Sequence, residues 1–392
     1  MEDFLKETLM SNTKAGTQIK FLHCGDIHLD TPISGIPEDK IIERKRELRA
    51  TFLRMMGYIR DREIDYVLIS GDLFDNEYVT NSVAELLIRE FGSCPDTKFI
   101  IAPGRHDCYN GNSVYSSGRL PENCYVFNSE TLSRFDFDED KVTIYGWAFT
   151  EKDYPVNPLL EKRVDDVSKI NIVCGYADLD GEGNFDTCPV STEDLKRFGA
   201  DYYAFGSRHA GTEFMNLEAS MYAYAGSLEC MGFSEPGIGG TKFISVRYNS
   251  GELSIDAKHM LFGHLEFKTE TIDITGVDTA NEIIARISQL IGERGYNYET
   301  ALRIILEGYI DPRFSVSKNL DSEAFGLYHF EIVDKTLPLF GTEALKRDMS
   351  VKGEVFRTIL PYMESENEEE RLVAAQAFRE ALAALENREI EA

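Results

Sequence analysis

Four short polar segments within the first 210 residues carry side chains that can bind a metal ion. They are Asp26-Ile27-His28, Gly71-Asp72-Leu73-Phe74-Asp75, Gly104-Arg105-His106-Asp107 and Gly206-Ser207-Arg208-His209. In the first segment, a carboxylate and an imidazole stand two residues apart at the end of a predicted strand. Side chains i and i+2 of a strand point to the same side, so the two can share one cation. One such segment often only caps a helix or closes a turn, but four in this order together indicate a metal site.

The elements that must position these segments are strands, because each segment follows a run of apolar residues. From residue 19 to about 175, such runs alternate with helical stretches, which predicts an α/β layer structure. Loops at the carboxyl ends of strands are where open α/β sheets place ligands, so we expect the four segments to converge. Residues 201–258 read as strands and turns, with a hairpin predicted at Asn249-Ser250-Gly251.

Length and composition favour two domains in a soluble protein. The chain has 392 residues, of which 43% are apolar, and this exceeds the usual size of one domain. We expect a polar tail at residues 1–18, a catalytic-type domain at 19–263 and an α+β domain at 264–392. The acidic start and the lack of an apolar run of membrane length predict a cytoplasmic protein with no membrane contact. The seven cysteines contain no CxxC pair, which predicts reduced thiols.

The charge balance argues against promiscuous nucleic-acid binding. Lysine and arginine total 41 against 68 acidic residues, so the net charge is −27. One local exception is the stretch 40–62, in which basic residues outnumber acids and apolar residues recur with helical spacing. We favour a helix with a solvated basic face there, and a face that contacts phosphates is the alternative.

The four segments resemble the DxH, GDxxD, GNHD and GHxH motifs of the calcineurin-like metallophosphoesterases. The flanking sequences FLHCGDIHLDTPISG and YAYAGSLECMGF are similar to the SbcD-type branch of DNA-repair exonucleases. The resemblance covers residues 19–250 and continues more faintly in DKTLPLF and VKGEVFRTIL. It implies a four-layer α/β/β/α sandwich, followed by a smaller C-terminal α+β domain that ends in a helix.

The resemblance also implies a divalent metal site, usually of two manganese ions that act together on a phosphoester. It assigns to the first ion the ligands Asp26, His28, Asp72 and His209, all of which are present. The positions private to the second ion hold Arg105, Tyr176 and Ser207, none of which is the ligand that the family uses. A shift of one residue would place Gly175 at the position of Tyr176. We therefore expect one divalent ion, manganese, rather than two.

Three residues of the third segment are the expected catalytic residues. His106 matches the histidine that stabilises the phosphate and shuttles a proton in the family, and Asp107 is expected to hold its ring by a hydrogen bond. Arg105 supplies a permanent charge and a planar fork suited to phosphate, in place of the second ion. Asp75 is expected to be a supporting acid rather than a metal ligand.

Two classes of function follow from this interpretation. The first is a metal-dependent phosphoesterase that resembles DNA-repair exonucleases, with weak or altered activity on DNA or on a nucleotide phosphodiester. Its expected partner is an ABC-type ATPase similar to SbcC. The second class is a catalytically silent scaffold of the same fold, which binds nucleic acid, a nucleotide or the ATPase partner. The terminal helix, from about residue 368 to 386, is expected to pack on its own domain, and docking on a partner is the alternative.

Overall fold

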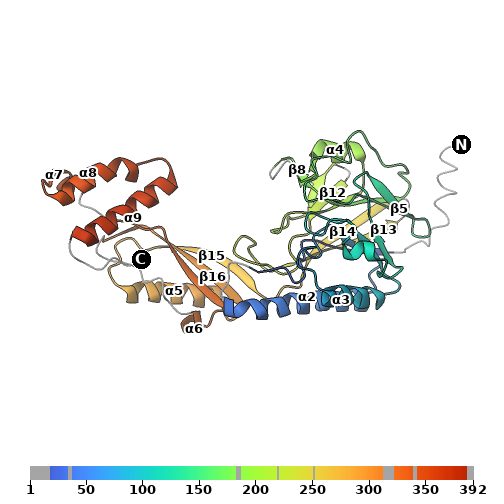
Figure 1. Cartoon of the computed structure of the whole chain (residues 1–392), viewed down its shortest axis with the longest axis horizontal. Coiled ribbons are helices and arrows are strands. Elements are labelled where there is room, and N and C mark those ends of the chain that lie inside the picture. Colours follow the sequence, from blue (N-terminus) through green and yellow to red (C-terminus); the bar gives the residue numbers. More distant parts are fainter. Residues whose placement is uncertain are drawn as a thin grey trace. The chain divides into compact units, whose positions relative to one another are not determined.

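The computed structural model describes residues 18–33, 38–181, 187–218, 220–249, 252–311, 322–338 and 342–385. The chain divides into two compact units, Met1–Glu266 and Phe267–Ala392 (Figure 1). This division lies close to the border predicted at residues 263 and 264, and the predicted polar tail is outside the described residues except for Gln18. No helix in the described ranges is long and apolar enough to cross a membrane.

The first unit is built on two six-stranded sheets. The first sheet has the order β14-β13-β1-β2-β3-β4, with the strands β1 (Gln18–Cys24), β2 (Tyr66–Ile69), β3 (Lys98–Ile101), β4 (Cys124–Val126), β13 (Gly240–Asn249) and β14 (Glu252–Leu261). The second has the order β11-β12-β10-β7-β6-β5, with β5 (Ser133–Phe137), β6 (Val142–Gly146), β7 (Ile170–Tyr176), β10 (Tyr202–Gly206), β11 (Met215–Leu217) and β12 (Ser220–Tyr224). The predicted hairpin is confirmed, because β13 and β14 pair antiparallel with Asn249 opposite Glu252.

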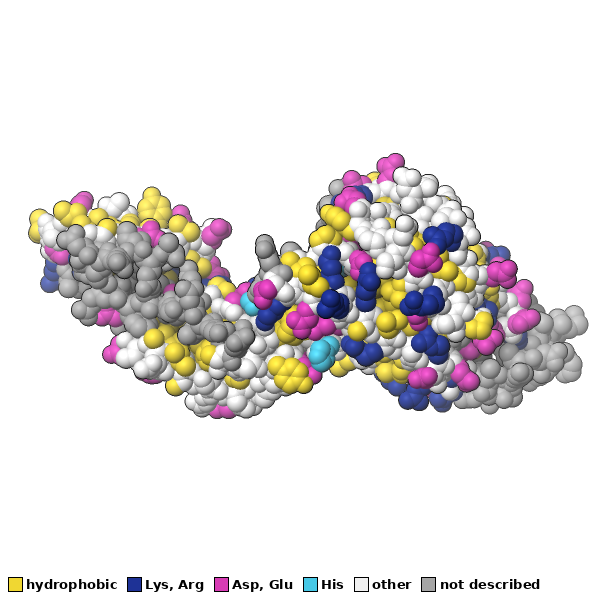
Figure 2. All heavy atoms as spheres, turned by 60° about the horizontal axis from the view of Figure 1, so that its bottom comes forward, with side chains coloured by type: hydrophobic (Ala, Val, Ile, Leu, Met, Phe, Trp, Pro, Cys, Tyr) yellow, Lys and Arg dark blue, Asp and Glu magenta, His cyan; other side chains and the backbone are white. Residues whose placement is uncertain are grey.

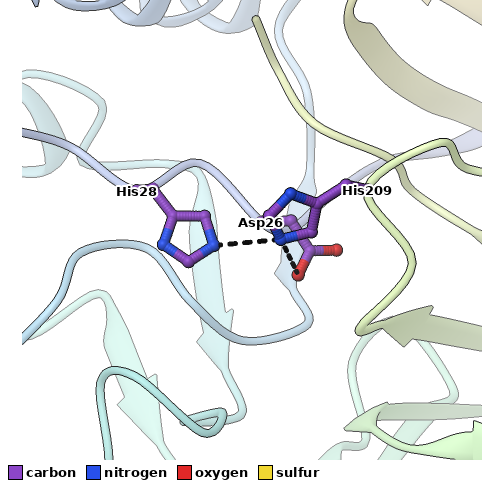
Figure 3. Close-up of side chains that lie close together, drawn as sticks. All are labelled: Asp26, His28 and His209. Atoms are coloured by element: carbon purple, nitrogen blue, oxygen red, sulfur yellow. Dashed lines mark hydrogen bonds and ion pairs between the residues drawn. The ribbon is translucent and has the colours of Figure 1, made fainter. Parts of the chain in front are cut away.

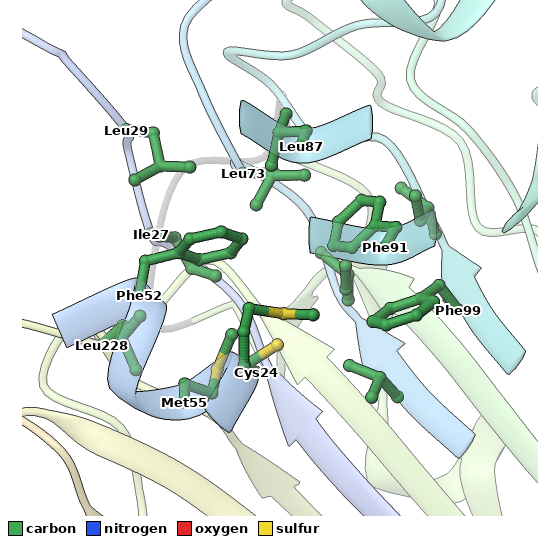
Figure 4. Packing of buried hydrophobic residues seen from close by; sticks show 14 of the residues in the cluster. Cys24, Ile27, Leu29, Phe52, Met55, Leu73, Leu87, Phe91, Phe99 and Leu228 are labelled. Atoms are coloured by element: carbon green, nitrogen blue, oxygen red, sulfur yellow. The ribbon is translucent and has the colours of Figure 1, made fainter. Parts of the chain in front are cut away.

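Helices cover the outer faces of both sheets. The helices α2 (Ile41–Arg62) and α3 (Asn81–Gly92) place apolar side chains such as Phe52 and Phe91 against β1 to β3 (Figure 4). On the second sheet, α4 (Thr192–Phe198) contributes Leu195 and Phe198 to a separate cluster. Each fully buried side chain of this kind contributes roughly 1.5–3 kcal/mol to folding. A third cluster fills the space between the sheets, so the unit has the expected four layers, α/β/β/α.

The parallel strands bring the four polar segments to one edge. Strands β1, β2 and β3 run parallel, and so do β6, β7, β10 and β12. The two sheets come very close at this edge, since a Cβ atom on Gly206 would lie 1.9 Å from the carbonyl oxygen of Ser70. His23 joins the sheets as well, with Nδ1 2.9 Å from the Tyr202 hydroxyl and Nε2 3.0 Å from Ser70 Oγ. Glycine at position 206 therefore permits the close approach that the converging segments need.

The basic stretch at residues 40–62 forms the predicted helix, but its face is only partly solvated. Arg44 is buried, and its guanidinium pairs with Glu229 at 3.2 Å. Arg49 pairs with both carboxylate oxygens of Asp30. The expected solvated basic face is therefore found only in part, because two of its arginines hold acidic side chains of neighbouring loops.

The second unit combines a three-stranded sheet with helices. The sheet has the order β15-β16-β18, with β15 (Glu266–Asp273), β16 (Thr300–Glu307) and β18 (His329–Asp334), and α5 (Ala280–Arg294) packs its isoleucine stripe on this sheet. Phe356 of α8 (Val351–Met363) contacts Phe378 of α9 (Glu368–Leu385), with ring centroids 5.3 Å apart. The terminal helix thus packs on its own unit. The remaining elements are α6 (Ser322–Phe325), α7 (Thr342–Arg347), the pair β8 (Asp178–Leu179) and β9 (Pro189–Val190), the pair β17 (Tyr309–Ile310) and β19 (Leu337–Pro338), and short 3-10 turns at Glu38–Lys40 and Val114–Ser117.

Candidate metal centre

Three side chains from distant segments meet at the edge where the strands end. Asp26, His28 and His209 each offer a ligand atom, and these atoms all lie within 4.8 Å of one another (Figure 3). Asp72 lies beside them, fully buried, with Oδ2 3.9 Å from His28 Nε2. Among the described residues, no other group of three or more such side chains meets this geometry. The four expected ligands of the first ion therefore converge.

The backbone that carries these ligands has an unusual conformation. Asp26, His28 and Asp72 have φ angles of 46°, 50° and 52°, in the left-handed region that residues other than glycine rarely adopt. Strand β1 has already ended at Cys24, so the two ligands of the first segment meet through this loop and not through strand alternation as we expected. The loop is held by the Asp26 N–H, which donates to Gly71 O, and by the His28 N–H, which donates to Asp72 O, both at 3.0 Å.

Both histidines present the same nitrogen to the centre. His28 Nδ1 lies 2.6 Å from Asp75 Oδ1, and His209 Nδ1 lies 2.7 Å from Glu235 Oε1. A carboxylate only accepts, so each Nδ1 is assigned as the donor and each Nε2 in the neutral ring carries a lone pair. The two Nε2 atoms face each other at 3.3 Å. A cation between the rings, or a proton on one Nε2, satisfies such an arrangement, and a carboxylate behind each imidazole is typical of metal-bound histidine.

One carboxylate oxygen of the centre also lacks a hydrogen-bond partner among the described residues. No hydrogen bond of normal geometry reaches Asp72 Oδ2 from the described residues, although this oxygen is fully buried. Asp26 is almost completely buried, and burial raises the pKa of its carboxyl, while the His209 imidazole opposes that shift. A buried carboxylate oxygen without a partner is costly, and a bound cation removes that cost. Two carboxylates and two inward-facing imidazole nitrogens fit a divalent cation.

Protons can supply part of the missing charge when no ion is bound. Burial alone would lower the pKa of His28, but the hydrogen bond to Asp75 and the nearby Asp72 carboxylate raise it to about 9. The same opposition acts on His209, where burial lowers the pKa and the hydrogen bond to Glu235 raises it above its usual value. The centre therefore attracts positive charge, either as a bound cation or as protons on its histidines.

The third segment lies at the rim of the centre, and one expectation about it is wrong. Asp107 does not orient His106, because its four acceptor positions are filled by the N–H groups of Asp72, Leu73 and Gly104 and by the Tyr115 hydroxyl. Asp75 contacts His106 instead, with Oδ2 3.5 Å from Nδ1, and this contact raises the pKa of His106. Asp107 thus shapes the loops that carry the ligands, and Asp75 supports both His28 and His106.

The positions of the second ion's private ligands lie around one cavity of about 730 Å³. Tyr176 is the residue at the site, because a Cβ on Gly175 would point into Trp147, while the Tyr176 ring lies against Gly71 and Gly104. The Ser207 hydroxyl donates to the Ala177 carbonyl at 2.7 Å. Arg105 pairs at 3.1 Å with Asp153, whose side chain is 66% exposed.

A second cavity of about 460 Å³ is also lined by Arg105. Its lining includes Asp75, His106, Tyr78 and Lys152, whereas the larger cavity is lined by Tyr176, Ser207, Arg208 and His209. Both volumes lie in the range of small-molecule sites. Arg105 borders both cavities.

One side chain of the site, Glu235, could not be predicted from the sequence. Glu235, which holds His209 and is 5% exposed, follows no strand and belongs to no motif that we considered. Only its contact with a ligand histidine identifies it.

Comparison with known proteins agrees with this geometry. A model of the calcineurin-like phosphoesterase family matches residues 19–210. The chain is 24% identical over 303 residues to the uncharacterized metallophosphoesterase YhaO of Bacillus subtilis strain 168, an alignment that covers 74% of this chain and 72% of the relative. It is 22% identical over 240 residues to the DNA double-strand break repair protein Mre11 of Methanopyrus kandleri, which covers 55% of this chain and 50% of that protein.

Similar solved structures include a dimetal phosphatase from Danio rerio, with a TM-score of 0.39 and 8% identity over 62% of this chain and 99% of that one. The protein TT1561 of Thermus thermophilus has a TM-score of 0.36 and 11% identity over 61% of this chain and 99% of that one.

Proposed function

Because residues 19–210 match the model of the calcineurin-like phosphoesterase family, whose members bind divalent metals, we propose that the chain is a metal-dependent phosphodiesterase with one firmly held ion, manganese. Its ligands are Asp26, His28, Asp72 and His209. The observation that carries the proposal is the pair of imidazoles whose Nδ1 atoms are held by carboxylates, so that both Nε2 atoms face one point. Hydrolysis of a generic aryl phosphodiester that depends on added Mn²⁺ tests it.

The residues at the rim supply the groups that act on the phosphate. A bound divalent ion polarises a phosphoester oxygen and lowers the pKa of a coordinated water. Arg105 is paired only at the exposed rim, where such a pair contributes little, so its guanidinium can exchange Asp153 for a phosphate. His106 holds a proton more firmly than usual because of Asp75 and is the proton donor to the leaving oxygen.

The two cavities support a diester as the substrate rather than a monoester. A phosphate that binds Arg105 beside the ligands has two open spaces next to it, of about 460 Å³ and about 730 Å³, because Arg105 lines both cavities. A diester carries two substituents, and each cavity can take one of them. A monoester would leave one cavity without substrate contacts. Relative hydrolysis of an aryl diester and the matching aryl monoester measures this preference.

We expect one ion rather than two because the three positions private to the second ion hold residues that the family does not use as ligands. None of Arg105, Tyr176 and Ser207 offers an imidazole, amide or carboxylate ligand. We expect the combined change Arg105→Asn, Tyr176→His and Ser207→His to add a second manganese site beside Asp72 and to raise the Mn²⁺-dependent rate.

Equilibrium dialysis against Mn²⁺ counts the ions in each protein. One ion per parent chain and two per triple variant agree with the assignment, and Arg105→Asn alone serves as the control that keeps two replaced positions. Two ions bound firmly by the parent chain would contradict it.

The similarity to Mre11 supports a nucleic-acid phosphodiester as the substrate and membership of the SbcD-type exonuclease branch. The net charge of −27 opposes nucleic acid in general, but Figure 2 shows a group of Lys and Arg side chains on one face of the first unit. A titration with an oligonucleotide over a range of salt separates this substrate from a small nucleotide, because binding of DNA falls steeply with salt.

An ABC-type ATPase similar to SbcC is the proposed partner. The apolar face of α9 already packs on α8, which argues against that face as the contact. Co-purification of the ATPase with a chain that lacks residues 365–392 tests this view. If the ATPase no longer co-purifies after this deletion, α9 becomes a candidate contact surface again.

A catalytically silent scaffold is the second candidate function. The observation that favours it is the replacement of all three private ligands of the second ion, since two ions act together in the family's chemistry. A chain that binds Mn²⁺ and a phosphate ligand but leaves the aryl diester intact would support the scaffold over the enzyme.

A further inference from the structure

A second buried glutamate lies behind the metal centre and takes no part in the proposed chemistry. Glu229 is 1% exposed and lies in the segment between β12 and β13. Its carboxylate accepts from Arg44 Nη1 at 3.2 Å and from Thr51 Oγ1 at 2.6 Å, both of α2. It also accepts from the N–H groups of His264 at 3.2 Å and Leu265 at 3.3 Å. The carboxylate thus joins α2 to the residues just before β15.

Hydrogen bonds lead from this carboxylate to a metal ligand. Arg44 Nη2 donates to the carbonyl of Cys230 at 2.7 Å. The next residue, Met231, donates its N–H to Glu235 Oε2 at 2.9 Å, and Glu235 Oε1 lies 2.7 Å from His209 Nδ1. At the other end of this segment, the Ser227 N–H donates to His209 O at 2.8 Å. Residues 227–235 therefore hold His209 at two points, its ring and its backbone.

We infer that Glu229 is a positioning residue for the metal centre, which it serves by fixing residues 227–235 and through them the ring of His209. The inference rests on the proposed metal site. A buried ion pair is a poor source of net stability, and Arg44 Nε has no hydrogen-bond partner among the described residues, so the role of this network lies in the geometry that its bonds specify.

The variant Glu229→Gln tests the inference while keeping the size of the side chain. Four donors converge on the carboxylate, but an amide has one oxygen, and its NH2 group faces a donor wherever it points. Direct removal of a carboxylate behind a metal-bound histidine costs about 10–100-fold in affinity, and we expect about 3- to 10-fold in Mn²⁺ Kd for this more remote change. Hydrogen exchange at the Ser227 and Met231 amides should become faster as well.

Glu90→Gln is the matched control, since Glu90 is also a buried glutamate paired with an arginine of α2, Arg60, at 3.1 Å. We expect it to lower the melting temperature while leaving the Mn²⁺ Kd within about 2-fold of the parent, because the side chain of Glu90 bonds Arg60 and Arg89 and not the residues that hold segment 227–235. If Glu229→Gln fails to fold, Thr51→Val removes one of the donors and should weaken Mn²⁺ in the same direction.

The outcomes separate this inference from the proposed function. A parent chain that binds no Mn²⁺ refutes the metal site, and faster exchange at Ser227 and Met231 in Glu229→Gln alone then still supports the connection through residues 227–235. A parent that binds Mn²⁺ together with variants of Glu229 and Thr51 that bind it equally well, with unchanged exchange at these amides, would overturn the positioning role.

Discussion

Replacement of Glu235 by glutamine is the sharpest test of how His209 is held. Glu235 is nearly buried and receives two donors, His209 Nδ1 at 2.7 Å and the Met231 N–H at 2.9 Å. An amide has one acceptor oxygen, so glutamine can satisfy one donor while its NH2 group faces the other. The ring of His209 therefore loses its fixed tautomer, or the Met231 N–H loses its acceptor. Both losses turn the His209 Nε2 lone pair away from the centre.

The expected cost follows from the role of such partners. Removal of a carboxylate behind a metal-bound histidine weakens metal binding by about 10–100-fold. This factor corresponds to about 1.4–2.7 kcal/mol of binding free energy. The loss of one buried hydrogen bond also lowers the stability of the metal-free chain by roughly 1–3 kcal/mol. The metal effect and the folding effect are of similar size, so they must be measured separately.

Isothermal titration with Mn²⁺ below the melting temperature of both proteins measures the change in metal-binding free energy. Thermal unfolding without metal measures the change in stability of the metal-free chain. Glu90→Gln, which also disturbs a buried glutamate, should lower the stability without changing the Mn²⁺ affinity. An Mn²⁺ Kd for Glu235→Gln within about 2-fold of the parent would refute the reasoning, because the partners of metal-bound histidines normally change affinity by much more.

Two further changes test other parts of the site. Asp75→Asn removes the charge that raises the pKa of His106. The protonated acid is lost on the alkaline limb of the pH–rate profile, so this limb should move to lower pH. An unmoved limb would exclude His106 as the proton donor. Gly71→Ala places a Cβ 2.4 Å from the Tyr176 ring at a φ of 98° and should lower stability by about 2–4 kcal/mol in a denaturant titration. Gly118→Ala, with a φ of 68° but open space around it, carries the backbone strain alone and should cost less.

The sequence by itself was sufficient for the layer structure and for the convergence of the proposed metal ligands. Apolar runs followed by short polar segments are a local pattern, and in a parallel sheet the ends of such strands must meet at one edge. Asp26, Asp72 and His209 could therefore be predicted without knowing any distance between them. The hairpin of β13 and β14 was predictable for the same reason, since its turn residues are adjacent in the chain.

The partners of these ligands were decided only by the tertiary structure. Asp107 follows His106 directly, which made it seem the natural support of that ring, yet its carboxylate points to the loop after β2 and Asp75 takes the role. Chain neighbours in a tight loop point in different directions, and the sequence does not record those directions.

Glu229 and Glu235 show the same limit for contacts between distant segments. Their partners are an arginine 185 residues away and a histidine 26 residues away, and no periodicity or motif links such positions. The sequence contains the groups that bind a cation because each stands at a predictable strand end. The carboxylates that orient those groups depend on how loops of both sheets fold against each other, and this packing exists only in the folded chain.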